Sequence, residues 1–508
     1  MLDRRRLLAM AAIAAAAARF SYAGATARVR DARPRQTRDP FALGVASGDP
    51  APDGFVLWTR ILGVAEDVAV AWEVAEDEGF RRIVRTGRAL GAKGRAGAVH
   101  VRLQGLLPGR RYFYRFHLGD AVSRVGCTAT IPQDPRVLRL ALTSCQHWEQ
   151  GWFSAYRDMI AQRPDAVLQV GDYVYEKSFG AGPDVRAFDA PEPRTLEAYR
   201  ARHALYRSDR DLADAHAGLP FIVSWDDHEV ENDYVAGEGV ATIDPVAFAR
   251  RRAAAYQAYF EHMPLDPARL LPGGEARLYR RFAWGRLASV HMLDTRQYRT
   301  PQPCAAGQRG GQIIRNCAEA AMPGASMLGA AQEAWLQRGL RRESTAWTLV
   351  AQQTLFSRLY LPQGRDAAYS DIWDGYAAAR ERALAALAQP AVRNPVLLGG
   401  DVHSFWINDV KRDFARPESA TVATEIVTSC LASRNGPEAL FGRARSLNPH
   451  VRFLDNAHAG YALLDVTPAR LMIDMRAVNS LVDPDSECRS LTRYAVESGR
   501  PGAVVTIS

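Results

Sequence analysis

The sequence has little lysine, little cysteine and, beyond its first twenty residues, no long apolar run. No uncharged apolar stretch past residue 20 approaches the roughly 20 residues that a membrane-spanning helix needs, which excludes a multi-span transporter. Six cysteines in 508 residues exclude a disulfide-dense miniprotein. Only three of the 64 basic side chains are lysines, which indicates a general preference for arginine rather than a surface built for phosphate backbones.

The positive charge is concentrated at the N-terminus. The formal net charge is +8, of which residues 1–27 carry +3 and residues 28–39 another +3. Only +2 remains for residues 40–508, so this part of the chain does not predict a nucleic-acid-binding surface. Hydrophobic residues make up 47% and charged residues 24%, as in soluble globular proteins, and 508 residues are enough for two or three domains.

The first residues have the features of an export signal. Arg4-Arg5-Arg6 precede the Ala-rich, weakly hydrophobic stretch LLAMAAIAAAAA, and small residues recur over positions 23–27, as before a cleavage site. Consecutive arginines ahead of such a stretch are typical of a signal read by the twin-arginine translocase, which exports folded proteins. An ordinary secretory signal or an amphipathic anchor is the alternative. We predict a signal peptide over 1–27, a linker over 28–40, and a periplasmic or secreted mature protein without a membrane span.

The pattern of apolar residues divides the rest of the chain in two. Residues 41–131 contain short runs rich in Val, Tyr, Phe and Thr separated by turn residues, which predicts a small β-sandwich of the fibronectin or immunoglobulin type. From residue 136 to 508 apolar strands alternate with helical patterns, which predicts an α/β domain. We expect its helices to include 195–216, 245–262, 329–342 and 376–388, and a late hairpin over 461–478. Cys304 and Cys317 flank a Gly-rich stretch and could close a small loop; the remaining connectivity is open.

Four predicted strands, 137–145, 166–172, 220–226 and 395–401, end on residues that bind metals or transfer protons. In open α/β sheets ligands bind at the carboxyl ends of the strands, so these ends predict one shared polar cluster. Residues 226–229, Asp-Asp-His-Glu, are four ionisable residues in a row after an apolar strand, and they are costly to bury unless they bind a ligand or take part in catalysis. The residues at or just beyond the four ends are Cys145; Asp172 and Tyr175; Asp227, His228 and Asn232; and Asp401 and His403.

Together these ends resemble the calcineurin-like metallophosphoesterase superfamily, and specifically its alkaline phosphatase D (PhoD-like) family. The common superfamily elements are Asp-x-His, Gly-Asp-x-x-Asp, Gly-Asn-His-Asp/Glu and Gly-His-x-His. This sequence departs from each of them: Cys145 takes a first-strand ligand position, Tyr175 replaces an Asp as in purple acid phosphatases, Asp227 replaces an Asn, and Asp401 replaces a His. These departures are characteristic of PhoD-like enzymes, as are the segments 47–50 followed by VLWTR, 293–299 and 332–336. The resemblance runs from about residue 41 to the C-terminus.

The resemblance implies a metal-dependent phosphate-ester hydrolase, an alkaline phosphatase or phosphodiesterase acting on small or polymeric phosphate esters. The implied fold is a four-layer metallophosphoesterase sandwich preceded by the all-β domain. A ferric ion, Fe(3+), would be held by Cys145, Asp172, Tyr175 and His403. Asp172 and Asp401 would bridge towards calcium, Ca(2+), which prefers oxygen ligands, and Asp227 and Asn232 are the candidates to complete its shell.

The mechanism that this resemblance implies uses a metal-activated water and no covalent phospho-enzyme. Asp172 would act through the ions that it holds, and His228 is the candidate general acid for the leaving oxygen. Arg296 or Arg358 is a candidate to bind a free phosphate oxygen. Two alternatives stay open: a phosphodiesterase or nucleotidase with two zinc or manganese ions, and a non-catalytic surface binding protein whose β-sandwich is the binding module.

Overall fold

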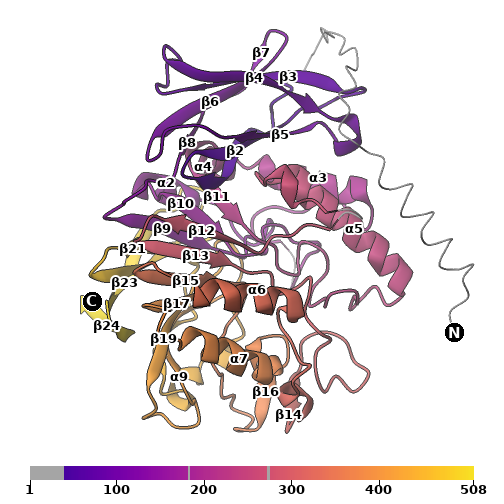
Figure 1. The fold of residues 1–508 in the computed structure, drawn as a ribbon. Coiled ribbons are helices and arrows are strands. Elements are labelled where there is room, and N and C mark those ends of the chain that lie inside the picture. The colour runs from indigo at the N-terminus through magenta and orange to yellow at the C-terminus, as the bar shows by residue number, and fades with distance from the viewer. Residues whose placement is uncertain (1–38, 181–182, 272–274, 508) are drawn as a thin grey trace, which may run out of the picture.

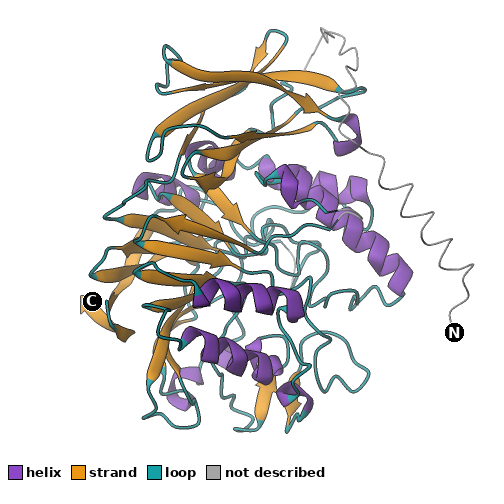
Figure 2. Cartoon of the chain, in the orientation of Figure 1, coloured by secondary structure: helices purple, strands orange, loops and turns teal. Residues whose placement is uncertain are grey.

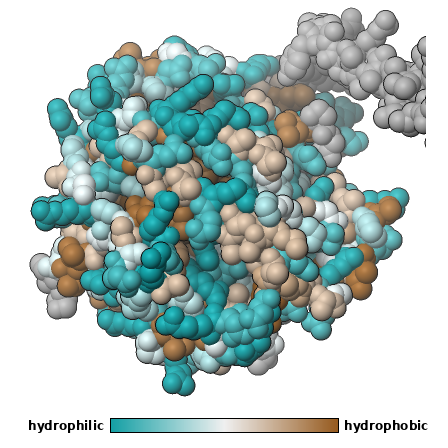
Figure 3. All heavy atoms as spheres, turned by 60° about the horizontal axis from the view of Figure 1, so that its bottom comes forward, coloured by the Kyte–Doolittle hydropathy of each residue, from teal (hydrophilic) through white to brown (hydrophobic). Residues whose placement is uncertain are grey.

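The computed structural model describes residues 39–180, 183–271 and 275–507 (Figure 1). The predicted signal peptide and nearly all of the predicted linker therefore lie outside the described residues. Within the described residues no helix is both long enough and apolar enough to cross a membrane. In Figure 3 hydrophilic side chains cover much of the face that is viewed, and hydrophobic ones gather in small groups.

Two mixed sheets form the centre of the molecule (Figures 1 and 2). In both, the central strands run parallel, so their carboxyl ends lie on a common edge. The larger sheet has the order β24 (Arg500–Ile507), β23 (Cys488–Glu497), β22 (Arg470–Val478), β21 (Gly460–Val466), β9 (Leu138–Thr143), β10 (Ala166–Gln169), β11 (Pro220–Val223), β1 (Val45–Ala51), β2 (Gly54–Arg60), β5 (Ala98–Leu103). The second has the order β12 (Arg280–Trp284), β13 (Ala288–Met292), β15 (Trp347–Ala351), β17 (Pro395–Gly399), β19 (Thr421–Val427), β18 (Phe405–Lys411), β20 (Val451–Asp455).

Alternation along the strands builds three apolar layers around these sheets. On β9 Leu140 and Leu142 face the second sheet, and Ala141 between them faces the helices, as a period of two residues requires. The outer face of the larger sheet is covered by α2 (Ala155–Gln162), α3 (Leu196–Arg207), α4 (Arg210–Gly218) and α5 (Pro245–His262). The outer face of the second sheet is covered by α6 (Gly329–Arg341) and α7 (Ala377–Leu387). The result is a helix–sheet–sheet–helix arrangement.

The N-terminal segment is all-β, as predicted. Its outer sheet has the order β4 (Ile83–Gly91), β3 (Val68–Ala75), β6 (Arg111–Leu118), β7 (Ala121–Val122), with β8 (Gly126–Ala129) paired to β6. It packs through a separate apolar core onto β1, β2 and β5. Those three strands continue the larger sheet, because Ser47 and Gly48 of β1 pair with Pro220 and Phe221 of β11. The predicted sandwich therefore shares its inner sheet with the α/β domain.

Most predicted helices form, with one difference. The helix expected over 195–216 is two helices, α3 and α4, because Asp209 accepts a hydrogen bond from Leu212 N (3.0 Å) and caps a new helix there. The expected helix over 245–262 matches α5, which Asp244 caps and Pro245 opens. The predicted hairpin matches β21 and β22.

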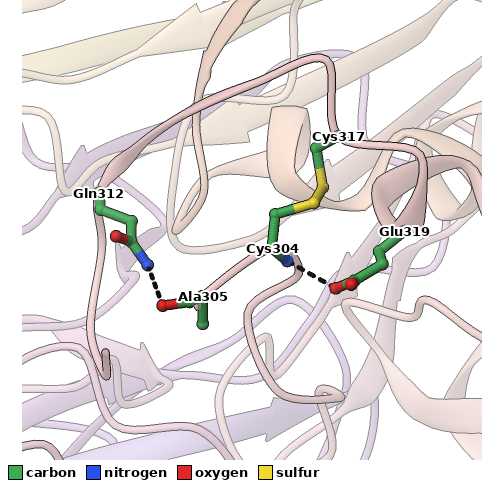
Figure 4. Close-up of a disulfide and its surroundings, with 5 residues drawn as sticks. All are labelled: Cys304, Ala305, Gln312, Cys317 and Glu319. Carbon is green, nitrogen blue, oxygen red and sulfur yellow. Dashed lines mark hydrogen bonds between the residues drawn. A yellow bond between two sulfur atoms is a disulfide. The ribbon is translucent and has the colours of Figure 1, made fainter. Parts of the chain in front are cut away.

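The remaining elements are short. β14 (Ile313–Arg315) pairs with β16 (Ala367–Tyr369), and α8 (Glu438–Phe441) and α9 (Ala444–Leu447) follow each other. Single 3-10 turns cover Lys93–Arg95, Pro267–Arg269, Glu319–Ala321 and Trp373–Tyr376. The expected loop between Cys304 and Cys317 is closed by a disulfide, beside which Cys304 N donates to Glu319 and Gln312 donates to Ala305 O (Figure 4).

Candidate active site

The four predicted strand ends meet where the carboxyl ends of the two sheets face each other. β9, β10 and β11 are neighbours in the larger sheet, and β17 belongs to the second. The loops that follow them touch through glycines. A Cβ on Gly400 would lie 2.3 Å from Ser144 Oγ, and a Cβ on Gly171 would lie 2.4 Å from the Cβ of Asp226. Glycine at both positions is therefore needed for the loops to approach each other.

Residues at the centre of the cluster have strained backbones. Cys145 (φ 57°), Asp172 (φ 55°), Asp401 (φ 66°) and His403 (φ 51°) are all left-handed, a conformation that side chains other than Gly rarely adopt. Such residues cost of order 1–3 kcal/mol each and concentrate at functional sites, where the surrounding structure enforces them. The strain supports a site whose geometry the fold imposes.

Asp172 is the common member of three groups of potential metal ligands. It lies with Cys145 and His403, with Asp227 and His228, and with Asp226 and Asp401, and in each group the ligand atoms are all within 4.8 Å of one another. The Tyr175 hydroxyl donates to Asp172 Oδ2 (3.0 Å) and lies 3.0 Å from His403 Nε2. The proposed iron ligands therefore lie together.

The cluster forms the floor of a cleft of about 440 Å³. The loops of the larger sheet contribute five of the residues that line it: Asp172, Tyr175, Asp227, His228 and Asn232. From the second sheet the loop after β17 brings Asp401 and His403. Cys145 is almost fully buried beneath them, against Tyr175.

Neighbouring groups fix the orientation of the two histidines. His403 Nδ1 donates to Arg434 O (2.7 Å), which leaves Nε2 free of a proton and facing Tyr175. His228 Nδ1 lies 2.8 Å from a carboxylate oxygen of Glu176, a fully buried residue. The His228 ring also lies against the Tyr175 ring, with 4.2 Å between ring centres.

A second buried carboxylate, Glu229, ties two of the loops together. Its oxygens accept hydrogen bonds from the backbone N–H groups of Tyr173 (2.6 Å), Asp226 (2.8 Å) and Asp172 (3.2 Å). The loops after β10 and β11 therefore share one anchor. Glu176 and Glu229 are neighbours of predicted site residues, but no spacing in the sequence indicates these contacts.

Several acidic groups of the cluster are buried close enough together to resist ionisation. Burial, reinforced by neighbouring carboxylates, raises the pKa of Asp226 to about 8 although Arg296 opposes it. Burial also raises the pKa of Asp401 to about 7 and that of the Cys145 thiol well above its usual range. Burial alone would lower the pKa of His228, but the negative charges of Asp172, Glu176 and Asp227 outweigh burial and raise that pKa well above its usual value.

The same residues fit bound cations. Asp172 Oδ1 and Asp227 Oδ1 are buried and have no hydrogen-bond partner among the described residues. Burying such an oxygen is costly unless a bound group interacts with it. A multivalent cation would bind both oxygens. Its charge would offset the repulsion between the carboxylates and so lower their pKa values. The Cys145 thiol and the His403 imidazole form one group with Asp172, near the Tyr175 phenol, and Asp226 and Asp401 form an all-carboxylate group with it.

The two arginines named as substrate ligands do not line the cleft. Arg296 is completely buried, and its guanidinium pairs with Asp226, with Asp371 (2.6 Å) and with Asp227 (3.5 Å). Arg358 pairs with Asp374 (3.0 Å) and donates to two backbone carbonyls. This placement favours a supporting role for both.

The structure adds members that the sequence pattern did not single out. Asp226 joins Asp172 and Asp401 as a potential ligand group. Asp233 lines the cleft, and its backbone N–H donates to Asp227 Oδ2 (2.6 Å). Asp226 is next to Asp227 in the same motif, and this position could have marked it as a potential ligand. Nothing in the sequence marks Asp233.

The chain matches known phosphatases over most of its length. The PhoD-like phosphatase family matches residues 140–475, and the N-terminal domain of PhoD-like phosphatases matches residues 25–132. Alkaline phosphatase D of Bacillus subtilis (strain 168) is 38% identical over 491 residues, which cover 93% of this chain and 83% of that protein.

Solved structures agree with the family and with the fold. The structure of PhoD matches with a TM-score of 0.88 and 36% identity, covering 94% of both chains. A purple acid phosphatase isolated from yellow lupin (Lupinus luteus) seeds shares the fold, with a TM-score of 0.56 and 10% identity over 91% of this chain and 77% of that one. These matches confirm the expected all-β domain followed by a mixed α/β metallophosphoesterase-like domain. The chain therefore belongs to the PhoD-like phosphatase family, a family of phosphoric ester hydrolases.

Proposed function

We propose that this phosphoric ester hydrolase works with a ferric ion and calcium at the Asp172 cluster. The observation that carries the proposal is the unequal distribution of ligands around Asp172. One ligand group joins Asp172 to the Cys145 thiol and the His403 imidazole, with the Tyr175 phenol 3.0 Å from both Asp172 and His403. Another joins Asp172 to the carboxylates of Asp226 and Asp401. Calcium prefers such oxygen ligands, whereas thiolate and phenolate favour a ferric ion.

In this proposal Asp172 is shared between the two ions, and every other predicted ligand belongs to one of them. Cys145, Tyr175 and His403 hold the iron together with Asp172. Asp172 and Asp401 extend towards calcium, and Asp227 and Asn232 complete the calcium shell. Asp226 is a further oxygen ligand at that side, although its ion pair with Arg296 competes for one oxygen.

The residues around the ions perform the rest of the chemistry. Bound cations lower the pKa of a coordinated water and compensate the charge on the phosphoryl oxygens. His228 lines the cleft, and Glu176 holds its Nδ1, so the other ring nitrogen can donate a proton to the leaving oxygen. Glu176 stabilises the protonated ring and fixes its orientation. No side chain needs to form a covalent bond to phosphorus.

Metal analysis combined with a phosphatase assay tests the proposal. The mature protein is purified after native export without chelators, and iron, calcium, zinc and manganese are measured per chain. Iron near one per chain with calcium supports the proposal, and Cys145→Ala should then lose iron and activity together. Two zinc or manganese ions without iron would replace the metal assignment. Folded protein without metal or activity would favour a binding protein, and full activity of Asp172→Asn would refute the site.

We also propose that the chain is exported in the folded state and acts in the periplasm or outside the cell. The Arg4-Arg5-Arg6 run and the Ala-rich stretch after it support a twin-arginine signal over 1–27, with a β domain over 41–131 and the hydrolase domain over 136–508. Replacing the three arginines by lysines should trap the precursor inside the cell. Unchanged export of that variant would favour the general secretory route.

A further inference from the structure

The walls of the cleft differ in character from its floor. Outside the ligand cluster, three separate segments contribute apolar side chains to the lining, among them Phe179, Leu361, Ile372, Leu440 and Phe441. Phe179 and Leu440 are half-buried, so part of each remains open to a ligand. Leu361 and Phe441 belong to an apolar core that supports this wall from behind.

These apolar side chains are held in place rather than loosely exposed. Phe441 packs edge-on against Trp406, with 5.3 Å between ring centres. The carbonyl of Phe179 accepts hydrogen bonds from Arg434 (3.1 Å) and from Gln150 (3.3 Å), which fixes the loop that carries it. A rigid apolar wall binds an apolar group at little cost in conformational entropy.

The Phe179 ring stands beside the candidate general acid. Its centre lies 5.0 Å from the His228 ring and 6.1 Å from the Tyr175 ring, edge-on to both. A phosphate ester that reaches the metal ligands therefore places one of its organic groups against Phe179. An apolar group is favoured there, because burying it removes apolar surface from water.

Charge on the described lining residues points in the same direction. Three of the four carboxylates that line the cleft, Asp172, Asp227 and Asp401, are assigned to the cations, so the charge open to a substrate arm is that of the other lining residues. Arg434 is the one guanidinium among the described residues that line it, and Asp184 pairs with it through two contacts of 2.8 Å. An additional anionic group on the substrate would find no unpaired cationic side chain on these described walls.

We propose that the cleft selects phosphate esters whose organic group is apolar, alkyl or aryl, and that Phe179 and Leu440 bind that group. The proposal rests on the assignment of this cleft as the hydrolytic site. It names a substrate class within that function: esters with one phosphate charge centre and an apolar arm, in preference to polyanionic or strongly polar esters.

The test uses diesters that share one leaving group. Metal-loaded enzyme is assayed with p-nitrophenyl phosphodiesters whose second arm is methyl, butyl, hexyl, phenyl or carboxymethyl, and kcat/KM is measured from nitrophenolate release. We expect kcat/KM to rise about twofold or more per added CH₂ from methyl to hexyl, which is below the roughly fourfold ceiling for a fully buried methylene. The carboxymethyl ester should be the poorest substrate.

Two variants and a matched control tie the preference to the wall. Leu440→Gln and Phe179→Ser should each reduce the ratio of hexyl to methyl kcat/KM by about threefold or more. Leu107→Gln changes a 58% exposed leucine on the N-terminal β domain and should leave the ratio unchanged. Circular dichroism confirms that each variant is folded.

The possible outcomes distinguish a failure of the proposed selectivity from a failure of the proposed hydrolytic site. Hydrolysis of every ester at equal kcat/KM, or a ratio unchanged in both wall variants, overturns the proposed selectivity and leaves the hydrolase intact. A preference for the carboxymethyl ester overturns it as well. No hydrolysis of any ester, p-nitrophenyl phosphate included, by folded and metal-loaded protein overturns the hydrolytic site and the selectivity together.

Discussion

Arg296→Met should destabilise the protein and weaken its metal site together. Arg296 is 0% exposed, and its guanidinium contacts the carboxylates of Asp226, Asp371 and Asp227. Methionine fills much of the same volume but supplies no charge. The substitution would leave three buried carboxylates without their shared cation.

The expected size of the effect follows from the charge left unpaired on Asp226, because Asp371 keeps its ion pair with Arg299 (2.7 Å). Removing one partner of a buried ion pair typically costs about 3–5 kcal/mol, because the remaining charge is buried without compensation. Natural domains are stable by only about 5–15 kcal/mol, so the loss is a large fraction of the total. Arg296 also lowers the pKa values of Asp226 and Asp401, so its loss should raise both and let protons compete with bound cations.

Urea unfolding with and without EDTA measures both effects. We expect the Arg296→Met midpoint to fall in either condition, and its bound metal to fall in elemental analysis. Arg338→Met, on the exposed surface of α6, is the control and should change stability by no more than about 0.5 kcal/mol. Adding Asp226→Asn to Arg296→Met should recover part of the loss in EDTA, because the ion pair of Asp226 is with Arg296 and its charge is the one left unpaired. A variant as stable as the wild type in EDTA would refute the reasoning.

Further predictions concern the disulfide, acid stability, the general acid and the metals. Cys304→Ser should lower the free energy of unfolding by about 3 kcal/mol, from the entropy of the loop that the disulfide closes, as measured by calorimetry. It should also reduce activity, because Gly311 N in that loop donates to Asp233 (2.8 Å). An unchanged melting temperature together with unchanged activity would contradict this. Burial, with Arg207 beside it, lowers the pKa of His203 to about 3. The unfolded chain therefore binds that proton first, so stability falls as pH drops from about 6.5 towards 3. His203→Phe should flatten that slope by up to about 1.4 kcal/mol per pH unit, and an unaltered slope would count against it. His228→Asn should lower kcat by about 10²-fold or more for alkyl esters and less for nitrophenyl esters, and equal losses would argue against proton donation. EDTA should abolish hydrolysis, with recovery on adding iron and calcium; recovery with zinc alone would replace that assignment.

The site positions were predictable because they follow strands with clear boundaries. Apolar runs that stop abruptly on Gly-Asp or Asp-Asp-His place polar groups at carboxyl ends, and parallel strands bring such ends to one edge. The helix over 245–262 was predictable for a similar local reason, since Asp244 and Pro245 mark its start. Each of these signals lies within a few residues of the element that it defines.

Contacts between distant segments could not be read in the same way. Arg296 and Asp226 are 70 residues apart, and although Arg296 lies in the characteristic segment 293–299, that segment does not indicate which residue it pairs with. The pairing of β1 with β11 joins residues 45–51 to residues 220–223, so the sequence suggested a sandwich that ends where the α/β domain begins. Such pairings depend on the whole set of packed layers, which no local pattern carries.

The neighbours Asp226 and Asp227 show why position alone does not assign a role. In sequence they are equivalent carboxylates after the same strand, and Asp227 was the one selected as a ligand. In the fold, burial and the nearby carboxylates raise the pKa of Asp226 to about 8. Burial also opposes ionisation of Asp227, but Arg296, His228 and the N–H of Asp233 outweigh it and hold its pKa at about 2. Asp227 therefore stays ionised, with Oδ1 3.5 Å from the Arg296 guanidinium, whereas Asp226 resists ionisation even beside Arg296. The difference between two adjacent residues arises from partners that only the folded chain supplies.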